Sequence, residues 1–248
     1  MHSTSITPLW QNSEDASFLL AALALGPMDN LVHVLIDRAS DNAAVVDPAW
    51  EPDAILQFVA QEGAQLTDIY LTHTHGDHVN AVAPLLEAIP ALRVHVHPLE
   101  RWRARPSSAV DWQIGMNRLR ETEFEVLFTP GHTAGGVCLL LPGHVISGDT
   151  LFVFGCGRCD LPGGDPRQMF ASLRQLKERL TPETMIHCGH TYSVQPVSTW
   201  AEELTSNPFL HFENEDDFVR YRMEVHDRMR NSPYGPVTVE EARRQLAA

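Results

Sequence analysis

The sequence lacks several features that would place it in other classes of protein. No apolar stretch approaches the roughly 20 residues that a membrane-spanning helix needs, and the best candidate, Phe18–Leu25, is too short. No basic segment with a cleavage site follows Met1, so we expect no secretory signal. Cysteine is scarce, with four in 248 residues, which favours reduced thiols. Together these absences predict a cytoplasmic protein without a membrane anchor.

Basic residues are also few. The chain has 18 Lys and Arg against 32 Asp and Glu, a formal net charge of -14. Nucleic acids and anionic membranes are bound through clustered Lys and Arg, so we expect neither as a partner. What remains is a chain whose apolar content, 44%, is ordinary for a globular protein.

Strand and helix patterns alternate along most of the chain, which indicates an α/β fold. Apolar runs typical of strands occur at 31–37, 43–47, 67–72, 93–98, 124–128, 136–152 and 184–188, and helical patterns at 51–63, 79–89 and from Asp165 onward. After Ser198 the strand signals stop. Phe218, Tyr221, Val225 and Met229 then form a helical stripe, and Thr238–Glu241 reads as a capping box. We therefore expect a main domain, 1–197, and a small helical segment, 198–248.

The stretch "LTHTHGDHVN" crowds ligand-type residues at the end of a predicted strand. His73 and His75 are two apart, so their imidazoles point to one side. Gly76 allows a turn, after which Asp77 and His78 open the next helix. Ligand sites form at strand ends in open α/β sheets. A single histidine here would suit an ordinary polar turn, but four such residues indicate a metal site.

The same arrangement recurs at three later strand ends. His132 follows Pro130-Gly131, Asp149 follows Gly148, and His190 follows Gly189. With the first cluster these residues supply five imidazoles and two carboxylates, enough for two divalent metals. Nitrogen and carboxylate ligands without thiolates suit zinc, iron or manganese, and the pattern does not select among them.

The motifs T-H-x-H-x-D-H, P-G-H-T, G-D-T-L-F and G-H-x-Y resemble those of the metallo-β-lactamase superfamily, and within it the glyoxalase II (hydroxyacylglutathione hydrolase) branch. The resemblance covers about residues 30–210. It includes "DTLFVFGCGRCD", similar to the loop after the bridging aspartate of glyoxalase II, and "EELTSNPFL", similar to the start of its helical C-terminal part.

The resemblance implies a fold and a ligand set. The fold would be the αβ/βα four-layer sandwich with a short helical C-terminal appendage. His73, His75 and His132 would bind one metal, Asp77, His78 and His190 the second, and Asp149 would bridge them. Zinc is favoured for both, with iron or manganese as alternatives.

The implied reaction is hydrolysis of a thioester, with an S-(2-hydroxyacyl)glutathione such as S-lactoylglutathione as substrate. Two metals hold a water and lower its pKa, and the resulting hydroxide attacks the acyl carbonyl. Asp77 would act as the catalytic residue that orients this hydroxide. A thiolate with a pKa of roughly 8.5 leaves without a dedicated acid.

The substrate contacts depart from the glyoxalase II pattern. Arg158 and Tyr192 match residues that meet glutathione in that family, but Asp160 stands where a tyrosine is expected. The acidic run at 213–217 stands where the family has basic residues. Such acids would repel a glutathione carboxylate, so a non-glutathione thioester is an alternative.

Two other functions stay open from the sequence. A persulfide dioxygenase of the same superfamily, which uses a single iron, shares the "GCGR-x-D" loop, although "CGHTYS" looks more like the hydrolase branch. A member that has lost its chemistry would be expected to lack ligands, and none of the seven is missing. Hydrolysis of a lactone or of a β-lactam is a less favoured alternative function.

Overall fold

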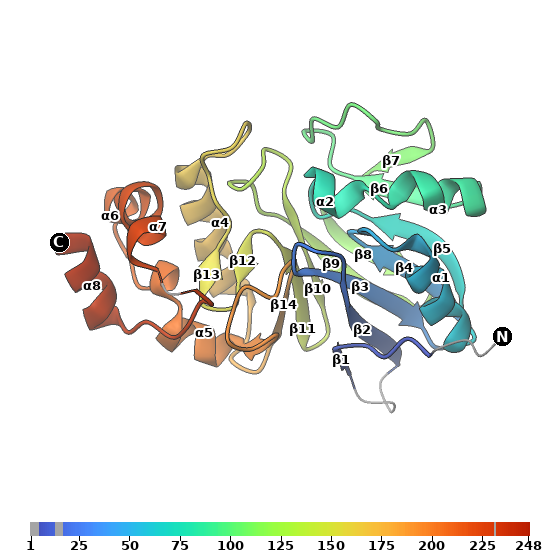
Figure 1. Ribbon diagram of the computed structural model, residues 1–248, viewed down its shortest axis with the longest axis horizontal. Helices are drawn as coiled ribbons and strands as arrows, with labels where there is room; N and C mark the ends of the chain where they lie inside the picture. The colour runs from blue at the N-terminus through green and yellow to red at the C-terminus, as the bar shows by residue number, and fades with distance from the viewer. Residues whose placement is uncertain (1–4, 13–16, 231) are drawn as a thin grey trace. The chain divides into compact units, whose positions relative to one another are not determined.

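The computed structural model describes residues 5–12, 17–230 and 232–248 (Figure 1). The chain divides into two compact units, Met1–Val126 and Leu127–Ala248, and passes from one to the other within strand β9, Thr122–Phe128. Each unit has its own apolar core. In the described part of the chain, no helix combines the length and the apolar character that crossing a membrane requires.

The first unit is built on a seven-stranded sheet whose strands follow one another in chain order. The first four strands pair antiparallel, whereas the last three join in parallel. The strands are β1 Trp10–Gln11, β2 Phe18–Leu25, β3 Asn30–Asp37, β4 Asn42–Val46, β5 Gln65–Tyr70, β6 Arg93–Val96 and β7 Ala109–Asp111.

Helices make the crossovers that parallel strands need. Helix α1, Pro52–Gln61, connects β4 to β5 and buries Ile55, Phe58 and Val59, which lie on one face at helical spacing. Burial of each such side chain contributes about 1.5–3 kcal/mol. Between β5 and β6 lie α2, Gly76–Val79, and α3, Val82–Ala88.

The prediction of a single helix over 79–89 is therefore wrong in one respect, because α2 ends at Val79 and α3 begins at Val82. The helix is interrupted between α2 and α3, because the Ala81 N–H donates to the Pro48 carbonyl at 3.2 Å. The Asn80 side chain accepts from the Trp50 N–H at 2.6 Å. Both bonds join the start of α3 to the loop after β4. The break therefore holds the turn that carries Asp77 and His78 against that loop.

A hairpin of β8, Gly115–Leu119, and β9 completes the first unit. The Phe124 ring of β9 packs on Tyr70 and Trp112, with ring centroids 5.4 Å and 6.2 Å away. Thr122 donates from Oγ1 to Asp37 Oδ1 at 2.8 Å. The hairpin is thus held by aromatic packing and a buried hydrogen bond.

In the second unit, β10, β11, β14 and β15 lie side by side in the order β15-β14-β11-β10. Strands β11 and β14 are parallel, and helix α4 lies between them in the chain. The bounds are β10 Val137–Leu141, β11 His144–Gly148, α4 Pro166–Arg179, β14 Met185–Cys188 and β15 Ser198–Thr199. Strands β12, Leu151–Phe152, and β13, Gly155–Cys156, form a separate small ribbon.

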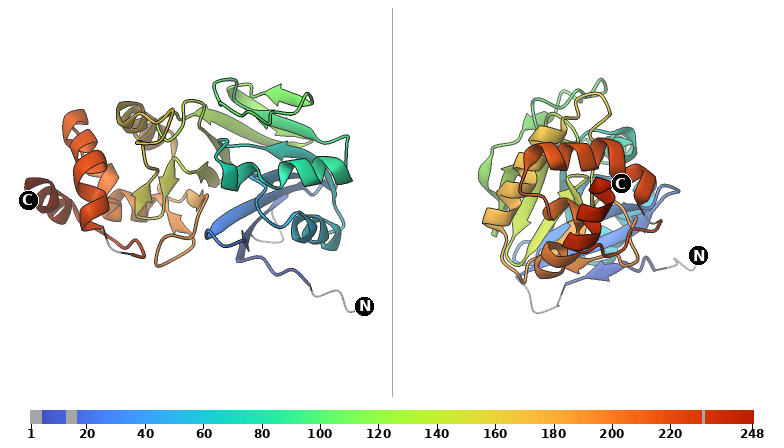
Figure 2. Two further views of the ribbon diagram at one scale, coloured as in Figure 1. Left: turned by 45° about the horizontal axis from the view of Figure 1, so that its top comes forward. Right: turned by 90° about the vertical axis from the view of Figure 1, so that its left-hand side faces the viewer.

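The C-terminal segment is helical, as predicted, and packs on α4 (Figure 2). Phe218 lies 5.4 Å from Phe170, centroid to centroid. The helices are α5 Trp200–Ser206, the 3-10 turn η1 Pro208–Leu210, α6 Glu215–Arg220, the π-helix η2 Tyr221–Val225, α7 His226–Met229 and α8 Val239–Ala247. The N-cap half of the predicted capping box is present, because Thr238 Oγ1 accepts from the Glu241 N–H at 3.3 Å.

One residue of the predicted stripe is misplaced. Phe218, Tyr221 and Val225 are buried, but Met229 is 47% exposed and His226 is buried instead. The π-helix between α6 and α7 has more residues per turn than an α-helix. It therefore shifts the buried face after residue 225.

Candidate metal site

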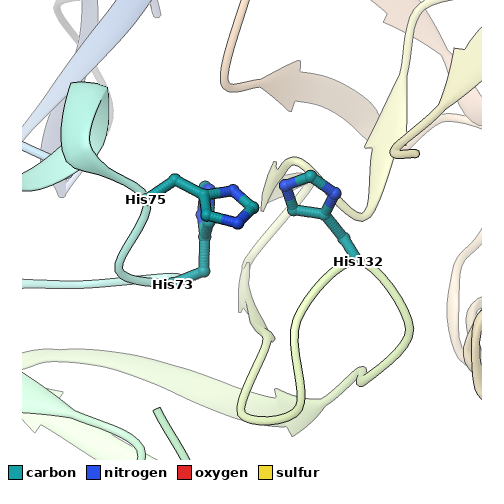
Figure 3. A group of neighbouring side chains, drawn as sticks. All are labelled: His73, His75 and His132. Atoms are coloured by element: carbon teal, nitrogen blue, oxygen red, sulfur yellow. The ribbon is translucent and has the colours of Figure 1, made fainter. Parts of the chain in front are cut away.

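The first set of predicted ligands follows β5. His73 and His75 extend from the segment between β5 and α2, and His78 lies within α2 (Figure 3 shows the first two). The His73 ring lies 4.9 Å from that of His75 and 4.2 Å from that of His78, centroid to centroid. His73 and His78 are buried, and His75 is half-buried. The short motif thus gathers three imidazoles at one strand end.

The ligand segment is fixed by Glu100. Its Oε2 accepts from the Thr74 N–H at 2.9 Å and from the Thr74 hydroxyl at 2.6 Å. Thr74 lies between the two histidines, so these bonds hold the backbone from which both imidazoles extend. Glu100 lies 26 positions from Thr74, so no local pattern could have indicated this contact.

Asp77, the predicted catalytic residue, is held by Asn30. Asn30 Nδ2 donates to the Asp77 backbone oxygen at 3.1 Å and to Oδ2 at 3.2 Å. Trp50 Nε1 donates to Asn30 Oδ1 at 2.7 Å, which fixes the amide orientation. Asp77 Oδ2 also lies 3.6 Å from His78 Nε2. Asp77 and His78, which are predicted to bind the same metal, thus place a carboxylate oxygen and an imidazole nitrogen close together.

His132 follows a turn that only glycine fits. Gly131 has a φ of +139°, and a Cβ there would lie 2.4 Å from the Met169 backbone of α4. His132 itself donates from Nδ1 to the Arg158 carbonyl at 2.7 Å. This bond leaves Nε2 as the nitrogen with a lone pair to offer. The ring is shown in Figure 3.

Parallel pairing of β11 and β14 places Asp149 and His190 at neighbouring strand ends. The Gly189 N–H donates to the Gly148 carbonyl at 2.9 Å. His132 Nε2 and His190 Nε2 each lie 3.5 Å from the same atom, Asp149 Oδ2. The three side chains are buried or nearly so. In the second unit, two imidazole nitrogens therefore lie close to one carboxylate oxygen.

These separations fit metal ligands. Two atoms that bind one tetrahedral zinc at about 2.0–2.1 Å lie about 3.4 Å apart. The His132–Asp149 and His190–Asp149 distances of 3.5 Å match this value, and are longer than ordinary N–H···O hydrogen bonds. The donor set of imidazoles and carboxylates suits a divalent transition metal.

Arg158 and Tyr192, the predicted substrate contacts, already have partners in the second unit. Arg158 donates from Nε and Nη2 to the two oxygens of Asp160 at 2.7 Å and 2.6 Å. These bonds lower the pKa of Asp160 to about 2. Tyr192 stacks on the His190 imidazole, with centroids 4.5 Å apart and planes 8° apart. Arg158 is thus paired with Asp160, and Tyr192 packs on His190, a predicted metal ligand.

The acidic run is also partly paired. Arg167 of α4 binds Glu215 and Asp216, and Lys177 lies 3.6 Å from Glu213. These ion pairs tie α6 and the preceding turn to α4. The expected repulsion of a substrate carboxylate is reduced accordingly, because part of the negative charge is compensated within the protein.

Comparisons with known proteins identify the family. The model of the metallo-beta-lactamase superfamily matches residues 32–190, more than half of the chain. The chain belongs to the metallo-β-lactamase superfamily. The predicted family and fold class are thereby confirmed, and so is the prediction of a metal-dependent hydrolase.

Two curated relatives are informative about chemistry. The chain is 37% identical over 214 residues to a hydroxyacylglutathione hydrolase of Thermosynechococcus vestitus, covering 85% of this chain and 80% of that protein. It is 32% identical over 197 residues to PksB of Bacillus subtilis, a probable polyketide biosynthesis zinc-dependent hydrolase, covering 78% of this chain and 87% of that one.

Two solved structures share the fold. ETHE1 from Myxococcus xanthus matches with a TM-score of 0.74 and 31% identity, over 83% of this chain and 90% of that one. TTHA1623 in a di-iron-bound form matches with a TM-score of 0.67 and 36% identity, over 76% of this chain and 99% of that one.

Proposed function

We propose that the two ligand sets together form one dinuclear metal centre. His73, His75 and His132 would hold the first metal, Asp77, His78 and His190 the second, and Asp149 would bridge them. The observation that carries this proposal is the convergence of His132 Nε2 and His190 Nε2 on Asp149 Oδ2, each at 3.5 Å. A bridging carboxylate needs such a nitrogen from each metal's ligand set.

Both metals are proposed to be divalent, with zinc favoured and iron or manganese as alternatives. One relative is named as a zinc-dependent hydrolase, and one structural neighbour was solved with two irons. The donor set of imidazoles and carboxylates is compatible with each of these metals.

The proposed reaction is hydrolysis of a thioester. Bound metals supply a water of lowered pKa and polarise the acyl oxygen. The chain's own contribution is positional. Asp77, fixed by Asn30, would accept a hydrogen bond from the attacking water and direct its lone pair at the acyl carbon. The thiolate, with a pKa of roughly 8.5, leaves without a protein acid.

An S-(2-hydroxyacyl)glutathione such as S-lactoylglutathione is the proposed substrate. The 37% identity to a hydroxyacylglutathione hydrolase supports it. Arg158 is the residue that would meet the tripeptide, but its guanidinium is already bound on two nitrogens by Asp160. The carboxylate of glutathione must therefore compete with Asp160.

Two alternatives follow from this pairing. A thiol carrier without a carboxylate at this position would not have to displace Asp160, which favours a non-glutathione thioester. The Arg158–Asp160 pair also belongs to the loop pattern shared with persulfide dioxygenases. That function would use a single iron and consume oxygen.

Substrate profiling separates these functions. The metal-loaded protein is assayed with S-lactoylglutathione, with an uncharged thioester of similar size, and with glutathione persulfide in an oxygen electrode. The proposal predicts free thiol from S-lactoylglutathione and no oxygen uptake. Oxygen consumption without thioester cleavage would replace it with the dioxygenase. Cleavage of the uncharged thioester alone would remove glutathione as the carrier.

A further inference from the structure

Positive charge is concentrated in one segment of this acidic chain. Residues 93–120 contain six arginines, no lysine and two acidic residues, Glu100 and Asp111, so the segment has a formal net charge of +4. Because the whole chain has a net charge of -14, all the other residues together carry -18. Such an uneven distribution favours an anionic partner at this segment.

Exposed apolar side chains are concentrated in the same segment. Of the eleven large apolar side chains that are exposed in the described part of the chain, four lie here, with exposed fractions between 44% and 65%: Leu99, Val110, Ile114 and Met116. Single apolar side chains scattered over a surface are normal, whereas a group of them marks a surface that contacts another molecule. The segment thus offers both charge and apolar area to a partner.

The loop after β6 alternates anchored and exposed side chains. Glu100 is buried, and Trp102 packs against the apolar core of the first unit. Leu99, Arg101 and Arg103, which alternate with them in the chain, are exposed. The loop, drawn in green in Figure 1, therefore presents one apolar and two basic side chains on a backbone that is fixed from the inside.

The two exposed arginines of this loop are uncompensated. Among the described residues, Arg101 and Arg103 have no ion-pair partner, whereas Arg105 pairs with Asp111. A guanidinium offers two parallel N–H donors that match a carboxylate. Arg101 and Arg103 can therefore bind carboxylates of another molecule without breaking an ion pair of the protein.

The exposed side chains after β6 and β7 belong to one edge of the sheet. The two strands are parallel, with Val96 opposite Asp111, and Leu99 and Ile114 each follow three positions later. Strand β5 is parallel to β6, so the predicted ligand segment, His73–His78, follows β5 at the same edge. Ligands of open α/β sheets bind in the crevice outside the carboxyl ends of the strands.

Two hydrogen bonds join these segments to the ligand segment. Glu100, in the loop after β6, accepts from the Thr74 N–H at 2.9 Å. Trp112, two positions before the exposed Ile114, donates from Nε1 to the Leu71 carbonyl at 2.9 Å. A molecule bound by the exposed side chains is therefore held next to the backbone that carries the first predicted metal ligands.

We infer that an acidic polypeptide carrying an acyl thioester binds to the basic-apolar surface, defined as Leu99, Arg101, Arg103, Ile114 and Met116. The inference rests on the proposed thioester hydrolysis and adds a substrate class to the small thioester proposed above. Carboxylates of the polypeptide pair with the two guanidinium groups, and its apolar side chains cover the other three residues. The reaction is unchanged: water hydrolyses the acyl C–S bond and gives the free acid and the thiol of the polypeptide.

The charge of the rest of the chain favours a polypeptide over more extended anions. Nucleic acids and anionic membranes extend beyond a small surface and would meet the remaining charge of -18, which repels them. An acidic polypeptide can place a few carboxylates on Arg101 and Arg103 alone. It can also supply apolar side chains for Leu99, Ile114 and Met116, which a phosphate backbone cannot.

Two synthetic peptides test the inference, each with the same leucines and a lactoyl thioester on its one cysteine. One peptide has glutamates around the cysteine, and the other has glutamines at the same positions. S-lactoyl-N-acetylcysteamine, a small uncharged thioester, reports the chemistry alone. The kcat/KM of the metal-loaded protein should be about 2- to 30-fold higher for the glutamate peptide than for the glutamine peptide, as two exposed ion pairs allow. This preference should decrease as salt is raised.

Arg101→Gln/Arg103→Gln should abolish the preference for the glutamate peptide. Because both side chains are exposed, the temperature of unfolding should stay that of the wild type. Arg243→Gln/Arg244→Gln is the matched control, since it removes two positive charges from exposed positions of α8. The control should keep the preference of the wild type.

Equal kcat/KM for the two peptides in the wild type would overturn the inference. So would a preference that survives in Arg101→Gln/Arg103→Gln, or one that the control loses to the same extent, since net charge would then explain it. Binding to phosphatidylglycerol vesicles that requires Arg101 and Arg103, without a peptide preference, would assign the surface to an anionic membrane instead. Failure to cleave any of the three thioesters would reject the thioester hydrolysis on which the inference rests.

Discussion

Arg158 is held in a two-point ion pair by Asp160, two residues further along the chain, with N–O distances of 2.7 Å and 2.6 Å. The resemblance to glyoxalase II assigns Arg158 to the thiol carrier, but the pair means that the guanidinium is already compensated. Both side chains are about half exposed, at 53% and 45%. The pair is therefore weak enough for a substrate to displace.

Asp160→Asn should release Arg158 for a substrate carboxylate. An exposed pair of this kind is worth about 0.2–1 kcal/mol, so the KM for S-lactoylglutathione should fall about 1.5- to 5-fold, with kcat unchanged. Steady-state kinetics at low and moderate salt give both constants. An uncharged thioester is the control, since its KM should not change. An equal decrease for both substrates would mean that Asp160 acts on the loop and not on charge.

Substitution of Tyr192 should change the affinity for the metal more than the affinity for the substrate. Its ring stacks on His190 at 4.5 Å, so Tyr192→Phe should keep the metal content and Tyr192→Ala should lower the affinity of the metal held by His190. Elemental analysis after dialysis against a weak chelator measures this. Full metal content in Tyr192→Ala, together with a raised KM, would restore Tyr192 to a role in substrate binding only.

Glu203 should make stability depend on pH. It is fully buried, and burial raises its pKa from 4.5 to about 7, against the opposing hydrogen bonds from Ser198, Asn207 and the Phe154 N–H. A carboxyl with a raised folded-state pKa binds more protons in the folded state. Its contribution is therefore complete below about pH 4.5 and is lost as pH rises through 7, by up to about 3 kcal/mol.

Urea unfolding of the wild type and of Glu203→Gln between pH 5 and 8 tests this. The free energy of unfolding of the wild type should fall with rising pH relative to that of Glu203→Gln. Parallel curves for the two proteins would show that the three donors keep Glu203 ionised throughout.

Asp149→Ala should remove at least one metal and abolish turnover, because both His132 Nε2 and His190 Nε2 lie 3.5 Å from Asp149 Oδ2. Elemental analysis and thioester cleavage are measured on the same sample. Full metal content in the variant would remove Asp149 as the bridge.

The ligand motifs could be predicted because each is local. His73, His75, Asp77 and His78 lie within six positions at one strand end, and His132, Asp149 and His190 each follow a glycine turn. Such turns can be recognised without knowing which strands pair.

The residues that support the ligands could not be predicted in the same way. Glu100 lies 26 positions after Thr74, and the parallel pairing of β5 and β6 brings their segments together. The π-helix that exposes Met229 depends on packing in the C-terminal core. It left no mark in the spacing of the apolar residues.

Two predictions from the sequence stay predictions. The boundary between a domain of 1–197 and a segment of 198–248 has not been tested, although Phe209, Phe218 and Tyr221 share a core with Leu127 and Cys138. The cytoplasmic location likewise rests on the sequence alone.

The number of metal ions per chain tests the central claim most directly. Elemental analysis of the purified protein, normalised to protein by amino-acid analysis, should give close to two transition-metal ions per chain, with zinc, iron or manganese making up the total. A reproducible single iron per chain would contradict the dinuclear hydrolase and favour the dioxygenase.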